Sequence, residues 1–418
     1  MHNLLASLLI VVSVSTYQNP EWRAVVDALQ AKHSDMKVEV LTAAPSVLDA
    51  GVILKEKAPR YVAYVMTPEE ARYNTIIKLH YAMRSLDDDP YDDAIWGIVS
   101  GPTAKDALRI ASSNEPTELY STLSTTGLGM DITSGPVTMF SDGYPEGCWK
   151  TQRDGVVTEH QKEGDITDEF VKAWNETDPD LILTSSHASQ FNLEMPFSRG
   201  NIVSVNGMFY ACPDLKLIDY TTGQFKPEAT STFNLQPSPL ASPTREKVWI
   251  AAGNCLIADN KGSSNMVMTA LGFGKVNQFV GYIKTTWFGE IGWGTWGNFA
   301  SSHYPLNESY YFANQNLVRT LVELEPTVQG KHLNEYPKEV LGKLWDYDGT
   351  CFWGDPVQKV GLKGAKKPVG IIFPESKKGR KLVSAPEGFE VFVADDFALV
   401  TKSPKNYPAD WESKLIFE

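Results

Sequence analysis

The chain has 418 residues, 42% hydrophobic and 21% charged, a composition typical of a globular protein and unlike that of a disordered or fibrous one. At roughly 150 residues per domain, this length predicts two or three folding units. The 51 acidic and 38 basic residues give a net charge of −13, which argues against a broad nucleic-acid-binding surface. Residues 357–383 are a local exception with eight Lys or Arg, and we expect a solvated basic edge there.

Residues 4–14 form an apolar run that suits either a signal peptide or a first β-strand. The run is too short to span a bilayer, and no Lys or Arg precedes it as a signal peptide would require. Asn19-Pro20 then has the pattern of a helix start. We therefore expect a strand that leads into a helix, and no transmembrane segment in the chain.

Strand and helix patterns alternate through the first quarter of the chain. Strands are predicted at residues 38–41, 61–66 and 94–99, and helices at 68–84 and 105–111. An acidic turn at residues 87–93 lacks the spacing of an EF-hand, so a solvated entry to the next strand is the preferred interpretation and structural calcium is not predicted. Residues 112–165 have no clear periodicity and are interpreted as a boundary with long loops. The alternation indicates βαβ units and a mainly parallel sheet.

The same alternation returns after residue 165. Strands are predicted at residues 181–184, 248–252 and 276–282, and helices at 166–174, 265–271 and 308–324. After residue 356 only short β-like runs follow, at 369–373 and 389–393. Residues 292–297 match the dinucleotide fingerprint G-x-G-x-x-G, but the tryptophans among the glycines would crowd a pyrophosphate, so an aromatic loop is expected instead.

Two of the predicted strands end in residues that can carry chemistry. The strand at 181–184 is followed by His187, and the strand at 248–252 is followed by Cys255. If the two strands are parallel neighbours, both side chains emerge at one edge of the sheet, where ligands of α/β proteins bind. A thiolate can attack an acyl carbon while an imidazole transfers the protons. A buried, structural cysteine is the alternative interpretation.

The remaining cysteines give little support to other chemistry. Cys148, Cys212 and Cys351 form no CxxC pair with each other or with Cys255, and none has zinc-ligand spacing to a histidine. Four cysteines are too few for a disulfide framework in a chain of this size, although one or two bridges stay open. A serine-hydrolase elbow, G-x-S-x-G, does not occur in the sequence.

Five blocks resemble, in order, the gingipain-like cysteine peptidases, relatives of the caspases, legumain and clostripain. The blocks are YDDAIWGIVSG (91–101), DLILTSSHAS (180–189), KVWIAAGNC (247–255), QFVGYIKTTW (278–287) and FWGDP (352–356). The resemblance covers about residues 60–360. It implies a caspase-like α/β fold with mainly parallel sheets flanked by helices in two subdomains, and it implies hydrolysis of peptide bonds.

The resemblance also assigns roles to residues. It makes His187 the general acid/base and Cys255 the nucleophile, and it draws the oxyanion donors from the N–H groups of Cys255 and of a neighbour of His187. Two positions depart from the family, since Ala188 replaces a usual Gly and Asn254 replaces a small apolar residue. A Cβ at position 188 is expected to tighten the loop, which leaves a catalytically inactive relative as an alternative.

The wall of the substrate pocket is assigned by the same resemblance to Thr286 and Trp287. Glu290 lies close by in the sequence, where it either favours a basic substrate residue or is a solvated acid. No metal and no cofactor are predicted.

The leading hypothesis is a cysteine endopeptidase that acts on peptide or protein substrates, with no nucleic-acid partner. A catalytically silent caspase-fold binding module is the first alternative, and a thiol amidase or transpeptidase is the second. The expected domains are an N-terminal non-catalytic α/β subdomain (1–125), a caspase-like catalytic subdomain (126–362) and a small β-rich extension (363–418). The compartment stays open, although the family resemblance is compatible with secretion or a periplasmic location.

Overall fold

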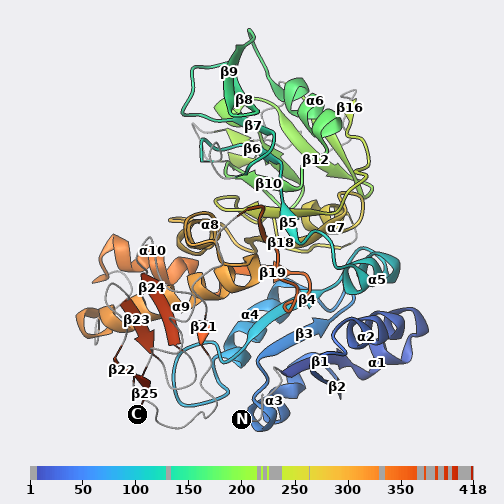
Figure 1. The fold of residues 1–418 in the computed structure, drawn as a ribbon, viewed down its shortest axis with the longest axis vertical. Coiled ribbons are helices and arrows are strands. Elements are labelled where there is room, and N and C mark those ends of the chain that lie inside the picture. Colours follow the sequence, from blue (N-terminus) through green and yellow to red (C-terminus); the bar gives the residue numbers. More distant parts are fainter. Residues whose placement is uncertain are drawn as a thin grey trace.

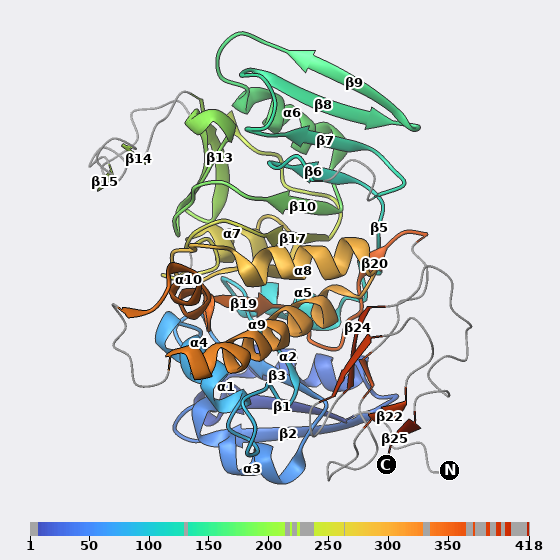
Figure 2. The same ribbon diagram turned by 90° about the vertical axis from the view of Figure 1, so that its left-hand side faces the viewer.

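The computed structural model describes residues 7–128, 133–213, 218–219, 224–225, 238–262, 264–328, 335–364, 371–372, 382–384, 390–393, 398–402 and 416–417. Its centre is a sheet of twelve strands (Figures 1 and 2). In spatial order these are β2 (Lys37–Ala43), β1 (Ser7–Ser13), β3 (Tyr61–Val65), β4 (Ile95–Val99), β19 (Thr350–Trp353), β18 (Val276–Tyr282), β17 (Lys247–Ala251), β10 (Leu181–Thr184), β6 (Thr122–Ser124), β7 (Val137–Phe140), β8 (Cys148–Arg153) and β9 (Val156–Gln161).

Neighbouring strands of this sheet run parallel, except for the antiparallel pairs β18–β19, β7–β8 and β8–β9. Helices cover both faces (Figures 1 and 2). One face carries α4 (Tyr73–Met83), α8 (Glu290–Ser301), α9 (Leu306–Val328) and α10 (Lys338–Asp346), and the other carries α2 (Pro20–Lys32), α5 (Ala104–Ser112), α6 (Thr167–Thr177) and α7 (Met266–Leu271). The predicted α/β architecture with a mainly parallel sheet flanked by helices is confirmed.

Shorter elements surround this sheet. They are the helical segments α1 (Val14–Gln18), η1 (Val47–Ala50), α3 (Gly51–Lys57) and η2 (Pro196–Ser198), the four-stranded sheet of β11 (Asn192–Glu194), β12 (Asn201–Val205), β13 (Met208–Cys212) and β16 (Ser238–Pro239), and the pairs β14 (Ile218–Asp219) with β15 (Gln224–Phe225) and β5 (Glu118–Leu119) with β20 (Gly361–Leu362). Near the C-terminus lie β21 (Ile371–Ile372), β24 (Ala398–Lys402) and β23 (Glu390–Val393) in one sheet, and β22 (Leu382–Ser384) with β25 (Ile416–Phe417) in another.

The first apolar run forms a buried strand, as the sequence predicts. β1 lies between β2 and β3, and Ile10, Val11 and Val12 are fully buried. The helix expected after it is α2, whose N-cap Asn19 accepts a hydrogen bond from the N–H of Glu21. A strand with helices on both faces has no solvated side, which explains why its sequence is continuously apolar and does not alternate.

The helix expected from residue 68 begins later, at Tyr73. The carboxylate of Glu70 explains the delay, because it accepts hydrogen bonds from the Thr16 hydroxyl (2.8 Å) and the Thr67 N–H (2.9 Å), and from the Ser13 hydroxyl. These contacts hold residues 67–70 in a turn. They also place a carboxylate between the ends of β1 and β3, the switch point where ligands of such sheets bind. Between β1 and β3, the side chain of Glu70 therefore lies at the switch point.

Residues 112–165 are more regular than predicted, because they contain β5 to β9. Strands β6 and β7 are buried in the large sheet although β6 consists of Thr, Leu and Ser. The hydroxyl groups are satisfied locally: Thr122 hydrogen bonds to Thr133 (3.1 Å), and Ser124 donates to the carbonyl of Thr126 (2.9 Å). A pattern search based on apolar residues misses such a strand.

The acidic turn at 87–93 is not fully solvated, which corrects the prediction. Asp92 and Asp93 are 3% and 5% exposed, and the N–H of Asp92 donates to the side chain of Gln315 on α9. Burial raises the pKa of Asp92 to about 6, although Arg84 at 3.8 Å opposes this rise. The end of the turn therefore packs under α9.

Four further predictions concern the cysteines, the basic segment, the domain boundaries and membrane-spanning helices. All four cysteines are free. Most of the basic segment 357–383 lies outside the described residues, and the domain boundaries at 125 and 362 stay predictions. In the ranges that the structure describes, none of the helices combines the length and apolarity needed to cross a membrane.

Candidate active site

Strands β10 and β17 are parallel neighbours, as the site hypothesis requires. Their register pairs Leu181 with Val248 and Thr184 with Ala251, so both strands end at the same level. His187 follows β10 by three residues and Cys255 follows β17 by four. In the order β7-β6-β10-β17-β18, the connections change direction between β6 and β10, and ligands of such sheets bind at the carboxyl ends of the strands beside this switch point.

The two loops that follow these strands are in direct contact. The N–H of Ala252 donates to the carbonyl of Thr184 (2.8 Å), which extends the strand pairing by one step. A Cβ on Gly253 would overlap the hydroxyl of Ser185, which would have to rotate away, so the two loops lie close together at this point. The loop before His187 and the loop before Cys255 therefore pack against each other over three consecutive residues.

Asn254 joins the same two loops through its side chain, which is fully buried. Its Oδ1 accepts from the hydroxyl of Thr184 (2.6 Å), and its Nδ2 donates to the carbonyl (2.8 Å) and the hydroxyl (3.2 Å) of Ser186. The sequence marks Asn254 only as a departure from a family pattern. Its bonding partners lie 68 and 70 residues away, so local sequence patterns could not reveal this contact.

Cys255 is partly buried beside the carboxyl end of β18. The N–H of Thr286 donates to its Sγ at 3.3 Å, which stabilises a thiolate. Burial acts in the opposite direction and is the larger effect, so the pKa of the thiol is raised from its usual value, and the carboxylate of Asp346 adds to this rise. The next helix along the chain, α7, begins only at Met266.

The residue after the cysteine has an unusual backbone conformation. Leu256 has a φ of 59°, in the left-handed region that non-glycine residues rarely adopt. Its N–H donates to the carbonyl of Lys284 (3.1 Å), which fixes the chain in this conformation. Residues in such strained conformations persist only where the surrounding structure holds them, and they are common at functional sites.

His187 is exposed, and the backbone around it is well defined. Its carbonyl accepts from the N–H of Glu194 (2.9 Å), and the N–H of Ser189 donates to the carbonyl of Asn192 (3.0 Å). These two bonds form an antiparallel bridge between Ala188 and Leu193. The backbone of Ala188 is therefore extended, and its buried Cβ introduces no left-handed strain. The expectation that a Cβ at position 188 distorts the loop finds no support in this geometry.

Two backbone N–H groups at this edge are available to a ligand. In the Ala188–Leu193 bridge the hydrogen bonds flank the pair, so the N–H of Ala188 points away from its partner strand. Among the residues that the structure describes, the N–H groups of Ala188 and Cys255 donate to no other residue. One belongs to the His187 loop and the other to the nucleophile candidate, as the family resemblance implies for oxyanion donors.

Thr286, predicted at the pocket wall, contacts Cys255, and Trp287 directly follows Thr286 in the chain. Thr286 touches the sulfur through its N–H, and Trp287 follows it with 45% of its surface exposed. The indole packs against Phe288 with ring centroids 5.5 Å apart, and the ammonium of Lys338 lies 5.8 Å from its centroid. The exposed part of the indole is accessible to a bound molecule.

Glu290 does not lie in an aromatic loop, which corrects the prediction for residues 287–296. It is the first residue of helix α8, and its carboxylate pairs with the ammonium of Lys343 on α10 at 2.7 Å. Its charge is thereby compensated. Of the glycines that suggested a loop, Gly292 has a packing role in the helix, because a Cβ there would overlap the carbonyl oxygen of Ala252.

The sequence did not single out Asp346, which lies at the end of α10. One of its carboxylate oxygens accepts from the Tyr282 hydroxyl (3.2 Å) and from the N–H of Glu290. Burial raises the pKa of Asp346. This carboxylate anchors the start of α8 beside the end of β18, and it contributes negative charge near Cys255.

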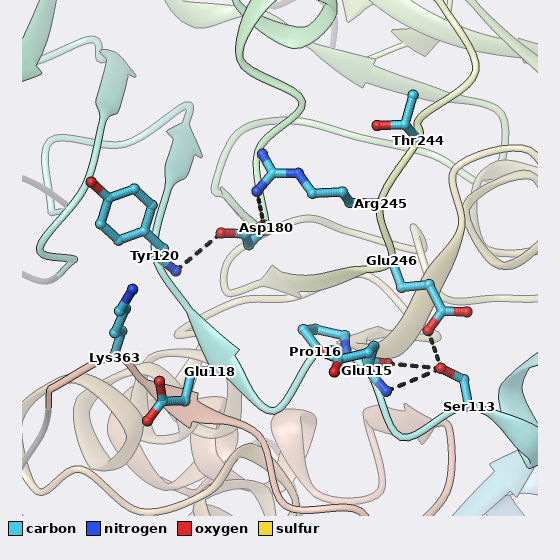
Figure 3. A pocket seen from close by; sticks show the side chains of 10 residues that line it. All are labelled: Ser113, Glu115, Pro116, Glu118, Tyr120, Asp180, Thr244, Arg245, Glu246 and Lys363. Atoms are coloured by element: carbon cyan, nitrogen blue, oxygen red, sulfur yellow. Dashed lines mark hydrogen bonds and ion pairs between the residues drawn. The ribbon is translucent and has the colours of Figure 1, made fainter.

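A cavity of about 710 Å³ lies at the opposite ends of the same strands (Figure 3). Its walls include Asp180, which directly precedes β10, and Glu246, which directly precedes β17. Asp180 pairs with Arg245 at 2.9 Å, and Glu246 bonds to Ser113 (Figure 3). The cavity is therefore separated from Cys255 by the length of the strands.

Comparison with known proteins assigns no family. No protein-family model matches the chain, and no curated protein matches it. Among solved structures, one described as "Structure of Protease" has a TM-score of 0.46 at 9% identity, over 96% of this chain and 93% of that one. The complex of Porphyromonas gingivalis RgpB pro- and mature domains has a TM-score of 0.47 at 10% identity, over 88% of this chain and 83% of that one. At this level of similarity, function must be inferred from the residues themselves.

Proposed function

We propose that this protein is a cysteine endopeptidase that hydrolyses peptide bonds with Cys255 as nucleophile and His187 as general acid/base. The observation that carries the proposal is the contact between their two loops, made by Asn254, Gly253 and Ala252 at the carboxyl ends of adjacent parallel strands. The ordered sequence blocks that resemble gingipain-like peptidases support the same assignment. The carboxyl ends of the parallel strands are where sheets of this kind bind ligands.

In the proposed reaction, His187 accepts the proton of the Cys255 thiol, and the sulfur attacks the carbonyl carbon of the substrate. The carbonyl oxygen then carries negative charge, which the N–H groups of Ala188 and Cys255 are available to stabilise. His187 returns the proton to the amide nitrogen, the C–N bond breaks, and the amine leaves. Water then gives up a proton to His187 and attacks the thioester, which releases the carboxylic acid and restores the thiol.

The raised pKa of Cys255 bears on how the thiolate forms. Since burial disfavours the thiolate, the resting sulfur is protonated at neutral pH unless the imidazolium of His187 compensates. We therefore expect the thiolate of the free enzyme to depend on the imidazolium of His187. The N–H of Thr286, 3.3 Å from the sulfur, supports the charge once it has formed.

A second candidate, a catalytically silent binding module, is favoured by the same pKa shift. A thiol kept protonated by burial is a poor nucleophile, and the exposed Trp287 could still contact a peptide. Both candidates use one site, so activity measurements separate them. A thiol amidase or transpeptidase would differ by acting on non-peptide amides or by passing the acyl group to an amine.

Glu290 and Trp287 bear on which substrates the proposed peptidase would prefer. The ion pair of Glu290 with Lys343 leaves no uncompensated charge on that carboxylate, so we do not propose a preference for basic substrate residues. Trp287 offers an apolar surface with an exposed face. Peptides with apolar or aromatic residues beside the scissile bond are the first to test.

The test is a peptide-library cleavage profile of the wild-type protein and of Cys255→Ala. We expect cleavage by the wild type and none by the variant, while Cys148→Ser, which changes another partly exposed cysteine, keeps full activity. Cleavage that survives in Cys255→Ala would end the proposal. Binding of peptides without cleavage by the wild type would favour the silent module.

A further inference from the structure

The amide of Asn254 has only one orientation that satisfies its neighbours. The indole N–H of Trp249 donates to the hydroxyl oxygen of Thr184 at 2.9 Å, and the hydroxyl in turn donates to Oδ1 of Asn254 at 2.6 Å. On the other side Nδ2 faces the carbonyl of Ser186, which can only accept. A flipped amide would bring two acceptors together at Ser186. The direction of every bond in this chain is therefore fixed.

Three members of this network are buried, and Ser186 is partly buried. Thr184, Trp249 and Asn254 are each at most 1% exposed. A buried, fully satisfied network holds its members in one arrangement, because any shift leaves a polar group without a partner. Asn254 immediately precedes Cys255, and Ser186 immediately precedes His187. The network thus ends at the two residues that the proposed reaction must keep in register.

We propose that Asn254 is a positioning residue that sets the placement of His187 relative to Cys255. The inference rests on the proposed function, which gives that placement its importance. Asn254 touches neither substrate nor reacting atoms in this scheme. It acts through the carbonyl of Ser186 and the hydroxyl of Thr184, both on the His187 loop.

The proposal predicts a specific kind of loss. A displacement of about 1 Å between reacting groups can lower a rate about 100-fold, so kcat should fall by that order while KM changes little. The reactivity of the thiol should change as well. Where His187 no longer supports the thiolate, a rise of one unit in the pKa of Cys255 lowers the thiolate fraction about tenfold below that pKa.

The experiment measures the rate of iodoacetamide alkylation of Cys255 between pH 5 and 9, in a Cys148→Ser background, for Asn254→Ala and Asn254→Asp. Alanine removes the whole network contact, and aspartate keeps the shape while it removes the donor to Ser186. Asn260→Ala is the matched control, since Asn260 is also a buried asparagine whose Nδ2 donates to two carbonyls, those of Pro68 and Ala71. His187→Ala defines the profile without the imidazole, and Asp346, which also acts on Cys255, is unchanged throughout.

We expect alkylation at pH 6 to fall about tenfold or more in both Asn254 variants and in His187→Ala, with Asn260→Ala close to wild type. Should one Asn254 variant fail to fold, the other carries the test. A wild-type profile in a folded Asn254 variant, with a changed profile in His187→Ala, would overturn the positioning role and leave the proposed function intact. A wild-type profile in His187→Ala would instead contradict the proposed dyad itself.

Discussion

Helix α8 provides a prediction in which two effects of one substitution oppose each other. Gly292 and Gly297 both lie inside this helix, where a glycine costs about 1 kcal/mol relative to alanine. Alanine at Gly297 meets no atom within 4 Å, so Gly297→Ala should stabilise the protein by about 0.5–1 kcal/mol. Alanine at Gly292 would overlap the carbonyl oxygen of Ala252, a backbone atom that cannot rotate away.

The overlap decides the sign at Gly292. Overpacking a filled site costs about 1–3 kcal/mol, and the upper part of this range applies because the neighbour is backbone. After the gain of about 1 kcal/mol in helix propensity, the net loss for Gly292→Ala should be about 2 kcal/mol. Since Ala252 adjoins the loop that holds Cys255, the variant should also alkylate more slowly at that residue.

Urea denaturation of the wild type and both variants, followed by far-ultraviolet circular dichroism, measures the difference. The midpoint should rise for Gly297→Ala and fall for Gly292→Ala, with similar slopes. Equal stabilisation by both substitutions would refute the close approach of α8 to Ala252. Destabilisation by both would contradict the helical conformation of residue 297.

Two further predictions concern buried titratable groups. His80 is fully buried and its pKa is lowered to about 4, first by desolvation, against about 6.5 in the unfolded chain. The unfolded state therefore binds the proton first as pH falls, and about 3 kcal/mol of stability is lost between pH 6.5 and pH 4. His80→Gln should remove this part of the pH dependence, so its stability deficit relative to wild type should shrink by about that amount from pH 7 to pH 4; a constant deficit in urea titrations would refute it. Asp355 is buried with Lys32 (2.9 Å) and His33 (2.7 Å), so Asp355→Asn leaves those groups without their anion and should cost about 3–5 kcal/mol at pH 7, whereas a loss below 1 kcal/mol would contradict this pairing.

The strands that carry the candidate site could be predicted from sequence because they are buried on both faces. β10 and β17 are mainly apolar, with Thr184 and Lys247 at their ends, and a short apolar run bounded by polar loops is typical of a central parallel strand. The same reasoning identified β1 and β18. The carboxyl ends of β10 and β17 then gave His187 and Cys255 as candidates, to which the family resemblance assigned roles.

Other elements could not be predicted, and the reasons are physical. α8 contains glycines that are unfavourable in an isolated helix, and one of them, Gly292, allows the helix to pack closely on Ala252. β6 is buried although it is rich in hydroxyl groups, because the Thr133 hydroxyl and the Thr126 carbonyl satisfy them. In both cases tertiary contacts override the local preference.

The candidate residues of the site could be predicted from the sequence, but the contacts between them could not. The residues after β10 and β17 could be named, but not the bonds from Asn254 to Thr184 and Ser186, which join positions about 70 residues apart. The raised pKa of Cys255 could not be predicted either, because it results from burial in the folded chain. The ion pair of Glu290 with Lys343 could not be predicted either, because Lys343 belongs to another helix.

The central claim is that Cys255 is a nucleophile activated by His187. Its most direct test is intact-protein mass spectrometry after reaction with a peptidyl acyloxymethyl ketone, with peptide mapping of the modified residue. We predict one label per chain, at Cys255, formed at least 100-fold more slowly in His187→Ala and not at all in Cys255→Ala. Labelling at Cys148, or labelling of Cys255 at the same rate without His187, would contradict the account.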